Sequence, residues 1–193
     1  MADAPLTRER ILEAAEEVLR RYGPTKATVV DVARALEVSH GTVYRHFASK
    51  AALRDAILRA WLERIDAQLA AVADGPGTPP ERLANWLRTL RNCKRAKVVD
   101  EPELFATYGA LAAEAREVVD EHVAEMTGQL QRILADGMAR GDFAETDPVT
   151  AALAVFDATV RFHHPAMAYL WQQPGEDAAF ESVLDTLLRG LRG

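Results

Sequence analysis

The chain has 193 residues, of which 49% are hydrophobic, and a formal net charge of −6. This length can bury a substantial core in one large or two small domains, and the acidic balance argues against a non-specific nucleic-acid binder. No run of about 18 apolar residues predicts a membrane span, and the N-terminus lacks the apolar segment of a signal peptide. The single Cys93 cannot form an intramolecular disulfide, which suits a reducing cytoplasm.

The first 50 residues predict three helices. Thr7 is a good N-cap for a helix with an apolar stripe, which Tyr22-Gly23-Pro24 should end. Thr28 caps a second, shorter helix, and Glu37-Val38-Ser39 interrupts its apolar spacing. A third short helix follows over His40–Phe47. Helix, tight turn and short helix together predict a helix-turn-helix.

The third of these helices carries an unusually polar outer face. Val43 and Phe47 lie four residues apart and can face the second helix. The outward positions are His40, Thr42, Tyr44, Arg45 and His46. Hydroxyl, imidazole, phenol and guanidinium groups suit phosphate oxygens and base edges better than a core. Considered alone, the segment is equally compatible with an ordinary helical hairpin of an all-α protein.

The distribution of charge favours DNA binding by this segment despite the acidic total. Residues 1–50 hold eight Lys and Arg against seven Asp and Glu, whereas residues 51–193 hold 15 against 22. Between Arg34 and Lys50 the only acid is Glu37. The acidity therefore lies outside the predicted DNA-reading surface, and it would help to orient the basic face towards DNA.

The segments Thr28–Ala33 and Gly41–Phe47, followed by Lys50, resemble the DNA-binding domain of the tetracycline-repressor (TetR/AcrR) family over about Leu6 to Leu58. Abundant Ala, Leu, Arg and Glu also favour an all-α protein. The resemblance implies about nine helices. They form an N-terminal three-helix helix-turn-helix DNA-binding domain, residues 1–52, and a C-terminal helical ligand-binding and dimerisation domain, residues 53–193.

The resemblance also implies which side chains meet DNA. Four positions match the family's contacts to the DNA backbone: Thr42, Tyr44, His46 and Lys50. His40 and Arg45 are candidates for base edges, since Arg can read guanine with two hydrogen bonds. Thr28, at a helix N-terminus, can reach a phosphate, and Gly41 leaves room for close backbone approach. The alternative for each is a solvated surface side chain.

Beyond this domain the sequence predicts a long helix and five more. Ser49 caps the long helix, which runs from Lys50 to about Ala73. The Pro- and Gly-rich residues 74–80 then form a loop. The later helices begin near Pro80, Pro102, Arg116, Pro148 and Asp177. The helix from Pro80 should fray through the basic run Arg91–Lys97, and Pro165 should kink the helix from Pro148.

The last two helices are expected to form the four-helix seam of a twofold homodimer, because they carry more apolar surface than one buried face needs. One recognition helix gives little specificity, and two would read a palindromic operator. The candidate dimerisation residues are Phe180, Val183, Leu184, Leu187 and Leu188. Packing of the last helix on its own subunit is the alternative.

Aromatic and Met side chains of the C-terminal helices suit a mainly apolar small-molecule inducer. The candidates are Trp86, Phe105, Tyr108, Met126, Phe156 and Phe162. His122 and His163 each lie on an apolar stripe, where an imidazole needs a partner. They can contact a ligand, each other or a metal, or serve as structural residues. The alternative for the aromatic set is plain core.

The sequence therefore predicts a ligand-responsive, sequence-specific transcriptional repressor that a small-molecule inducer releases from double-stranded DNA. No catalytic residues, cofactor or metal site are expected, since no metal-binding or nucleophile motif is present. Two alternatives stay open. One is a helical metal-binding protein or metalloenzyme that uses His122 and His163, with His164 and nearby acids. The other is a constitutive DNA-binding protein with weak, salt-dependent binding.

Overall fold

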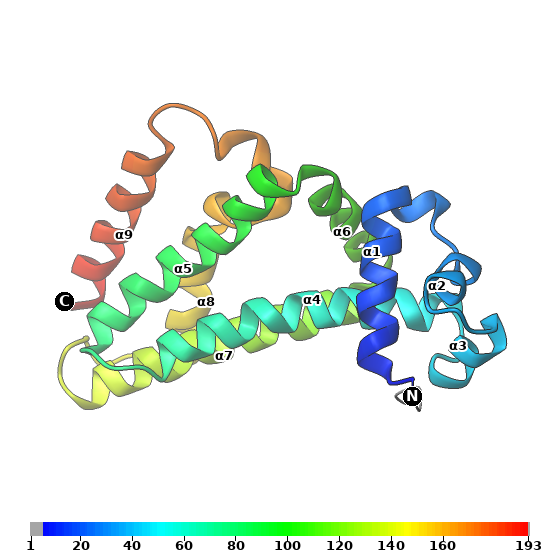
Figure 1. Ribbon diagram of the computed structural model, residues 1–193. Helices are drawn as coiled ribbons and strands as arrows, with labels where there is room; N and C mark the ends of the chain where they lie inside the picture. The colour runs from blue at the N-terminus through cyan, green and yellow to red at the C-terminus, as the bar shows by residue number, and fades with distance from the viewer. Residues whose placement is uncertain (1–5, 193) are drawn as a thin grey trace. The chain divides into compact units, whose positions relative to one another are not determined.

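The structure is a computed structural model that describes residues 6–192, apart from the side chains of residues 24 and 25. It confirms the all-α prediction (Figure 1). The α-helices are α1 (Arg8–Lys26), α2 (Val29–Ala35), α3 (His40–His46), α4 (Lys50–Ala73), α5 (Pro79–Asp100), α6 (Pro102–Glu114), α7 (Arg116–Ala139), α8 (Pro148–Ala158) and α9 (Glu176–Arg192). Two 3-10 helices, η1 (Val160–Phe162) and η2 (Pro165–Leu170), lie between α8 and α9. Within residues 6–192 no helix is long and apolar enough to cross a membrane.

The chain divides into two compact units. Unit 1 holds the residues up to Glu63 together with Glu101–Val119, and unit 2 holds Arg64–Asp100 together with the residues from Asp120 onward. Helices α4 and α7 therefore each contribute residues to both units. These units are defined by packing within one chain. The functional division after residue 52 stays a prediction.

In unit 1, α1 packs on both α2 and α6 (Figure 1). Buried side chains of α1, among them Ile11 and Ala15, supply the core of this packing. Trp61 of α4 stacks on Tyr108 of α6, with ring centroids 4.3 Å apart. The predicted stop after Tyr22 appears as a break within α1, because Gly23 adopts a left-handed φ of 72°.

Local capping fixes the helix-turn-helix. The Thr28 side chain accepts from the backbone N–H of Asp31, and the Asp31 carboxylate accepts from the backbone N–H of Thr28, which is a capping box. Glu37 adopts a left-handed φ of 56° just after α2 and so turns the chain sharply. Ser39 caps α3, and Val43 and Phe47 are buried as expected. The short helices thus rely on caps and on two apolar anchors.

Unit 2 has a core of apolar side chains from α5, α7, α8 and α9. The turn after α7 depends on Gly137, because a Cβ there would lie 2.2 Å from Cδ2 of Phe143. The Gly137 carbonyl also accepts from the backbone N–H groups of Asp142 and Phe143, at 2.8 and 3.2 Å. The side chain of Phe143 is buried at this place, so the glycine is needed for close packing.

The prediction that α5 frays through its basic run is wrong. Helix α5 continues to Asp100. Arg91 and Arg95 both contact Asp177 of α9, and Arg88 forms a 2.6 Å ion pair with Glu181 one turn further along α9. Acids on a distant helix therefore pair with the basic run, and sequence spacing alone could not reveal this pairing.

The prediction of one helix kinked at Pro165 is also wrong. Helix α8 ends at Ala158, seven residues earlier, and the chain continues through η1 and η2. The Thr159 hydroxyl donates to the carbonyls of Val155 and Phe156, both at 3.0 Å, and so competes with the backbone at the helix end. Pro165 begins η2, where its missing N–H leaves no bond unmade.

Candidate nucleic-acid interface

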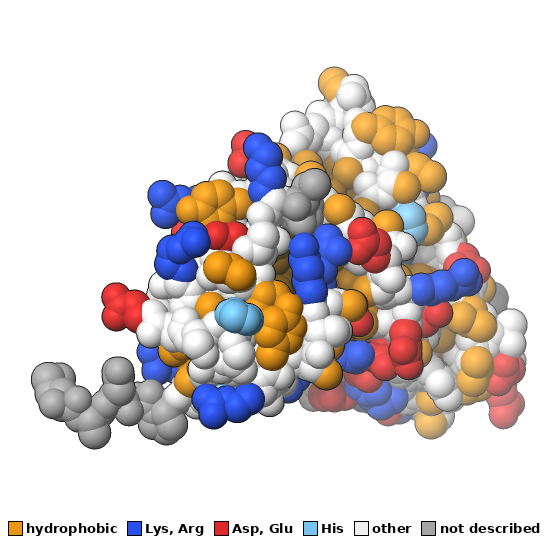
Figure 2. All heavy atoms as spheres, turned by 90° about the vertical axis from the view of Figure 1, so that its right-hand side faces the viewer, with side chains coloured by type: hydrophobic (Ala, Val, Ile, Leu, Met, Phe, Trp, Pro, Cys, Tyr) orange, Lys and Arg blue, Asp and Glu red, His pale blue; other side chains and the backbone are white. Residues whose placement is uncertain are grey.

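Helix α3 presents the predicted polar face to solvent. The side chains of His40, Tyr44 and Arg45 are exposed, as is Gly41, and Thr42 and His46 are half-buried. Tyr44 keeps 42% of its surface exposed although it is a large aromatic residue. Figure 2 views α2 and α3 from their solvent side, where Lys and Arg side chains lie around a His and apolar side chains. The arrangement offers donors and a ring edge to an anionic partner.

The face is organised by contacts along the helix. His40 and Tyr44 pack edge to face, with ring centroids 6.3 Å apart. Thr42 lies between the Ser39 hydroxyl, at 2.9 Å, and the Arg45 guanidinium, at 3.5 Å. Side chains one turn apart therefore restrict each other before any partner binds, which reduces the entropy lost on binding.

Arg8 anchors the C-terminal end of α3 from α1, a role that sequence reasoning missed. Its guanidinium lies 4.2 Å from the ring centroid of Phe47 and donates to the carbonyl of His46. This carbonyl belongs to the last turn of α3, where a cation is favourable. Since the contact joins residues 38 positions apart, only the fold could reveal it.

Thr28 has a structural role that bears on its predicted phosphate contact. Its hydroxyl lies 2.6 Å from the Asp31 carboxylate, to which it donates, and accepts from the backbone N–H of Asp31 at 3.2 Å. The hydrogen bond that the Thr28 hydroxyl donates to the carboxylate lowers the pKa of Asp31 below its usual value. The backbone N–H of Thr28 and the charge of Arg34 lower this pKa as well. The hydroxyl therefore both donates and accepts a hydrogen bond within the cap. A phosphate that contacts Thr28 would have to share the hydroxyl with Asp31.

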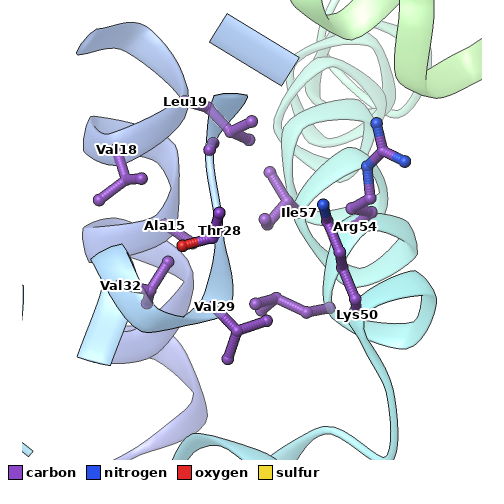
Figure 3. A pocket seen from close by; sticks show the side chains of 11 residues that line it. Ala15, Val18, Leu19, Thr28, Val29, Val32, Lys50, Arg54 and Ile57 are labelled. Carbon is purple, nitrogen blue, oxygen red and sulfur yellow. The ribbon is translucent and has the colours of Figure 1, made fainter. Parts of the chain in front are cut away.

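Lys50 is exposed at the first position of α4. Figure 3 shows it beside Arg54 along one wall of a groove, with apolar side chains of α1 and α2 opposite. The groove has a volume of about 20 Å³, which suits a water molecule rather than an effector. Arg54 is held by Glu114 of α6 at 2.7 Å. Lys50 and Arg54 therefore place two cations near α2, and one of them is paired with an acid.

The eight predicted ligand residues are divided between the two units. Phe105 and Tyr108 belong to unit 1. The remaining six lie in unit 2: Trp86, His122, Met126, Phe156, Phe162 and His163. Two of these six are tied into the core. The Trp86 indole N–H donates to Gln129 at 2.8 Å, and the Phe162 ring packs edge to face on Phe180 with centroids 5.2 Å apart.

His122 lies in a buried polar cluster with two residues that sequence reasoning missed, Asp66 of α4 and Lys94 of α5. Its Nδ1 lies 2.7 Å from an Asp66 carboxylate oxygen, and its Nε2 lies 3.4 Å from the Lys94 ammonium. Only 5% of Lys94 and 6% of His122 is exposed. Burial lowers the pKa of Lys94 to about 8 and also lowers the pKa of His122, and Asp66 opposes both shifts.

His163 is buried close to this cluster. Its Nε2 lies 3.3 Å from the carbonyl of Phe156, and its ring lies 4.7 Å from the Phe156 ring. The pKa of His163 is lowered to about 4, chiefly by burial and in smaller part by the charges of Lys94, His164 and His122, while the contact with the Phe156 carbonyl opposes the shift. Over the described part of the chain, no three His, Cys, Asp or Glu side chains gather as a metal site would require.

The predicted dimerisation residues differ in what they can offer a second copy. Phe180 and Leu184 are buried within the protomer, whereas Val183, Leu187 and Leu188 are half-buried. Helix α8 exposes the apolar side chains of Val149 and Leu153, and Val160 at the start of η1 is exposed as well. The sequence places Leu153 and Val160 on the apolar stripe of this region, whereas Val149 was not singled out. The exposure of Val149, Leu153 and Val160, at 47%, 48% and 38%, leaves an apolar stripe uncovered within the protomer.

Comparison with protein families identifies both parts of the chain. A model of the bacterial regulatory proteins of the tetR family matches residues 11–57, and a model of the tetracyclin repressor-like C-terminal domain matches residues 79–184. The HTH-type transcriptional repressor KstR of Mycolicibacterium smegmatis is 34% identical over 132 residues, which are 67% of this chain and 64% of KstR. The chain thus spans less than two thirds of the length of this curated relative.

Solved structures share the fold over most of the chain. A TetR/AcrR-family regulator from Thermobifida fusca is 26% identical with a TM-score of 0.63, covering 96% of this chain and 98% of that one. FadR of Bacillus subtilis, solved with stearoyl-CoA, is 19% identical with a TM-score of 0.67, covering 95% and 99%. The two family models match the helix-turn-helix and the helical C-terminal part in turn. The chain therefore belongs to the tetracycline-repressor (TetR) family of bacterial transcriptional regulators.

Proposed function

We propose that the protein is a ligand-responsive, sequence-specific DNA-binding regulator that represses transcription until a small molecule releases it. The polar exposed face of α3, set on a capped helix-turn-helix, is the observation that carries this proposal. The name of its relative KstR, a transcriptional repressor, supports the direction of regulation. A regulator also accounts for the chain better than an enzyme does, since its family consists of transcriptional regulators.

In this proposal α3 enters the major groove. Arg45 and His40 read base edges, and Tyr44, Thr42, His46 and Lys50 contact the DNA backbone. Gly41 permits close approach of the chain, and Thr28 contributes a phosphate contact at the start of α2. The arrangement separates contacts that set affinity from contacts that set sequence preference.

A homodimer presents two copies of α3 to a palindromic operator. The exposed stripe of α8, with Val149 and Leu153, joins the half-buried side chains of α9, Val183, Leu187 and Leu188, in the proposed dimer surface. Two helices from each copy would then bury apolar area that the isolated protomer leaves in water. Phe180 and Leu184 support this surface from within the protomer.

Release requires that the inducer bind the DNA-free state more tightly than the DNA-bound state. The inducer of this proposal is mainly apolar and binds in unit 2, next to aromatic side chains such as Phe156. Helix α4 begins with Lys50 and ends in unit 2, so a shift of this helix would change the DNA contact.

The test is binding of the purified protein to its own upstream intergenic DNA and to scrambled DNA at near-physiological salt. We expect an even number of protomers to bind the intergenic DNA on the order of 10³-fold more tightly than the scrambled DNA. Tyr44→Ala and Lys50→Ala should weaken this binding. Tyr169→Ala is the matched control, because Tyr169 is 70% exposed and lies in η2. Equal weak binding to both DNAs would contradict the proposal.

A further inference from the structure

Helix α3 is too short to hold its own direction. It has seven residues, and isolated helices of this length are unstable in water. Its N-terminal end is fixed by the Ser39 hydroxyl, which accepts from the backbone N–H of Thr42 at 3.2 Å. Its apolar side is fixed by Val43 and Phe47, which are buried. The C-terminal end of the helix therefore needs a support of its own.

This C-terminal end lacks the usual helix cap. Phe47, the residue after α3, is extended with φ −134° and ψ 116°, so the helix does not end on a left-handed residue. The last carbonyls of a helix find no partner within it. The Val43 carbonyl still accepts from the backbone N–H of Phe47 at 3.1 Å. The His46 carbonyl accepts instead from the guanidinium of Arg8, the first residue of α1.

Arg8 makes a second contact at the same place. Its guanidinium lies 4.2 Å from the ring centroid of Phe47, a side chain that is only 2% exposed. A planar guanidinium can cover a ring with its face while an N–H at its edge donates to a carbonyl, whereas an ammonium has no such flat, forked shape. Arg8 therefore holds two successive residues, one by its backbone and one by its ring.

Helix α1 itself gives no reason for a cation at this position. Arg8 directly follows the Thr7 cap, and the first turn of a helix favours acids over cations. Glu9 is such an acid. Hydrogen bonds from its own backbone N–H and from Thr7 lower the pKa of Glu9, and the charges of Arg8 and His46 add to this shift. The first turn of α1 thus lies close to the last turn of α3, and α3 accounts for the position of Arg8.

We infer that Arg8 is a positioning residue for sequence-specific DNA binding. It fixes the direction in which α3 presents Tyr44 and His46, and it makes no DNA contact of its own. This inference rests on the proposed function, and it adds a residue outside α2 and α3 to those that decide operator affinity. Because Arg8 is exposed, the rival role is a direct phosphate contact, which predicts different measurements.

The two roles differ in their dependence on DNA sequence, salt and side-chain shape. Loss of a phosphate contact weakens binding to any DNA, lowers the slope of log affinity against log salt by about one, and is rescued by another cation. Loss of a positioning contact misaligns α3 with the base edges, so it weakens binding to the operator more than binding to unrelated DNA. Lysine keeps the charge of arginine but lacks its planar fork, so it cannot restore the positioning contact.

The experiment is fluorescence anisotropy of the full-length protein with its upstream intergenic DNA and with scrambled DNA, over a salt series. Arg8→Gln should lose about tenfold in affinity for the intergenic DNA and less than about twofold for scrambled DNA, because one hydrogen bond and one cation–π contact disappear. Its salt slope should stay within about half a unit of the wild-type slope. Arg8→Lys should still lose about threefold or more for the intergenic DNA.

The matched control is Arg21→Gln. Arg21 is an exposed arginine of the same helix and lies 5.4 Å from the ring centroid of Tyr22, but that ring belongs to α1 itself. This variant should keep both affinities within about twofold of the wild type. Thermal unfolding checks that each variant is folded at the temperature of the assay.

Three results would overturn the inference. Unchanged affinity of Arg8→Gln for the intergenic DNA would show that α3 does not depend on Arg8. Equal losses on both DNAs, with rescue by Arg8→Lys, would identify a phosphate contact. A loss in Arg21→Gln as large as in Arg8→Gln would show that only overall charge matters.

Hydrogen exchange separates this inference from the proposed function, because it needs no DNA. In Arg8→Gln the amides of α3 should exchange about tenfold faster than in the wild type, while those of α4 keep their rates. If the wild type binds both DNAs equally and α3 alone exchanges faster in the variant, the proposed function fails and the hold of Arg8 on α3 stands. If DNA binding is specific but Arg8→Gln changes neither exchange nor affinity, the inference fails and the regulator stands.

Discussion

The surface of α3 and the buried cluster of Asp66, Lys94 and His122 both concentrate polar side chains on a helical scaffold, and they do so in opposite environments. On α3 the side chains stay in water, where they retain hydration until a partner replaces it. In the cluster they have already lost water, and the lowered pKa values of Lys94 and His122 record that loss. Exposed polar groups cost little free energy to keep, whereas buried polar groups are costly unless they pair with one another.

The largest effect should come from α3 itself. The double variant Arg45→Ala, Lys50→Ala should lose about 10²-fold or more in operator affinity, because the proposed base contact and the proposed phosphate contact are removed together. Lys50→Ala alone should lower the slope of log affinity against log salt by about one. Fluorescence anisotropy over a salt series measures both. Arg189→Ala removes an exposed guanidinium from α9, and an equal loss in that control would show that overall charge matters rather than α3.

The next effect concerns the cluster and its response to pH. The pKa of Lys94 falls from 10.5 in the unfolded chain to about 8 in the folded one. The unfolded state therefore binds more protons between these values, and stability should rise with pH over that window. The contribution is at most about 3 kcal/mol. Urea unfolding at pH 7 to 10.5 measures it.

Lys94→Met is the comparison for this pH dependence. It should remove the rise between pH 8 and 10.5, because the group that titrates in this window is gone. If stability depends on pH in the same way in both proteins, burial does not lower the pKa of Lys94 in the folded state.

A third prediction tests close packing in unit 2. Gly137→Ala should destabilise the protein by about 1–3 kcal/mol, because its Cβ meets the buried ring of Phe143. Gly128→Ala, on the same helix with nothing within 4 Å of its Cβ, should be neutral or stabilising by up to about 1 kcal/mol. Chemical denaturation of both variants measures the contrast. Equal effects would show that helix propensity rather than the Phe143 contact decides.

The smallest effect should come from the caps. Thr28→Ala removes the capping box of α2 and should cost about 1 kcal/mol of stability. Thr78 precedes α5 in unit 2 and pairs with Glu81 in the first turn of that helix, in the same way as Thr28 pairs with Asp31. Thr78→Ala removes this pairing. Hydrogen exchange should show faster opening of α2 in the first variant and of the start of α5 in the second. If each variant instead speeds hydrogen exchange equally throughout the protein, the caps act only through global stability.

The sequence by itself determined the helices of the helix-turn-helix and the polar surface of α3. Local signals sufficed there: Thr28 and Ser39 cap, Val43 and Phe47 anchor, and the polar residues between them have no other place than solvent. The family resemblance rested on these same local residues. Contacts within about one helical turn decide such features, and the sequence records them directly.

The tertiary structure alone decided the rest. It brought Asp177 to the basic run of α5, Gln129 to Trp86, and Asp66 and Lys94 to His122. In the sequence Lys94 appears as one cation in a solvated run, because nothing local distinguishes it from Lys97. Which lysine is buried depends on the direction that α5 turns towards α4 and α7, and this direction is set by packing between residues far apart in the chain.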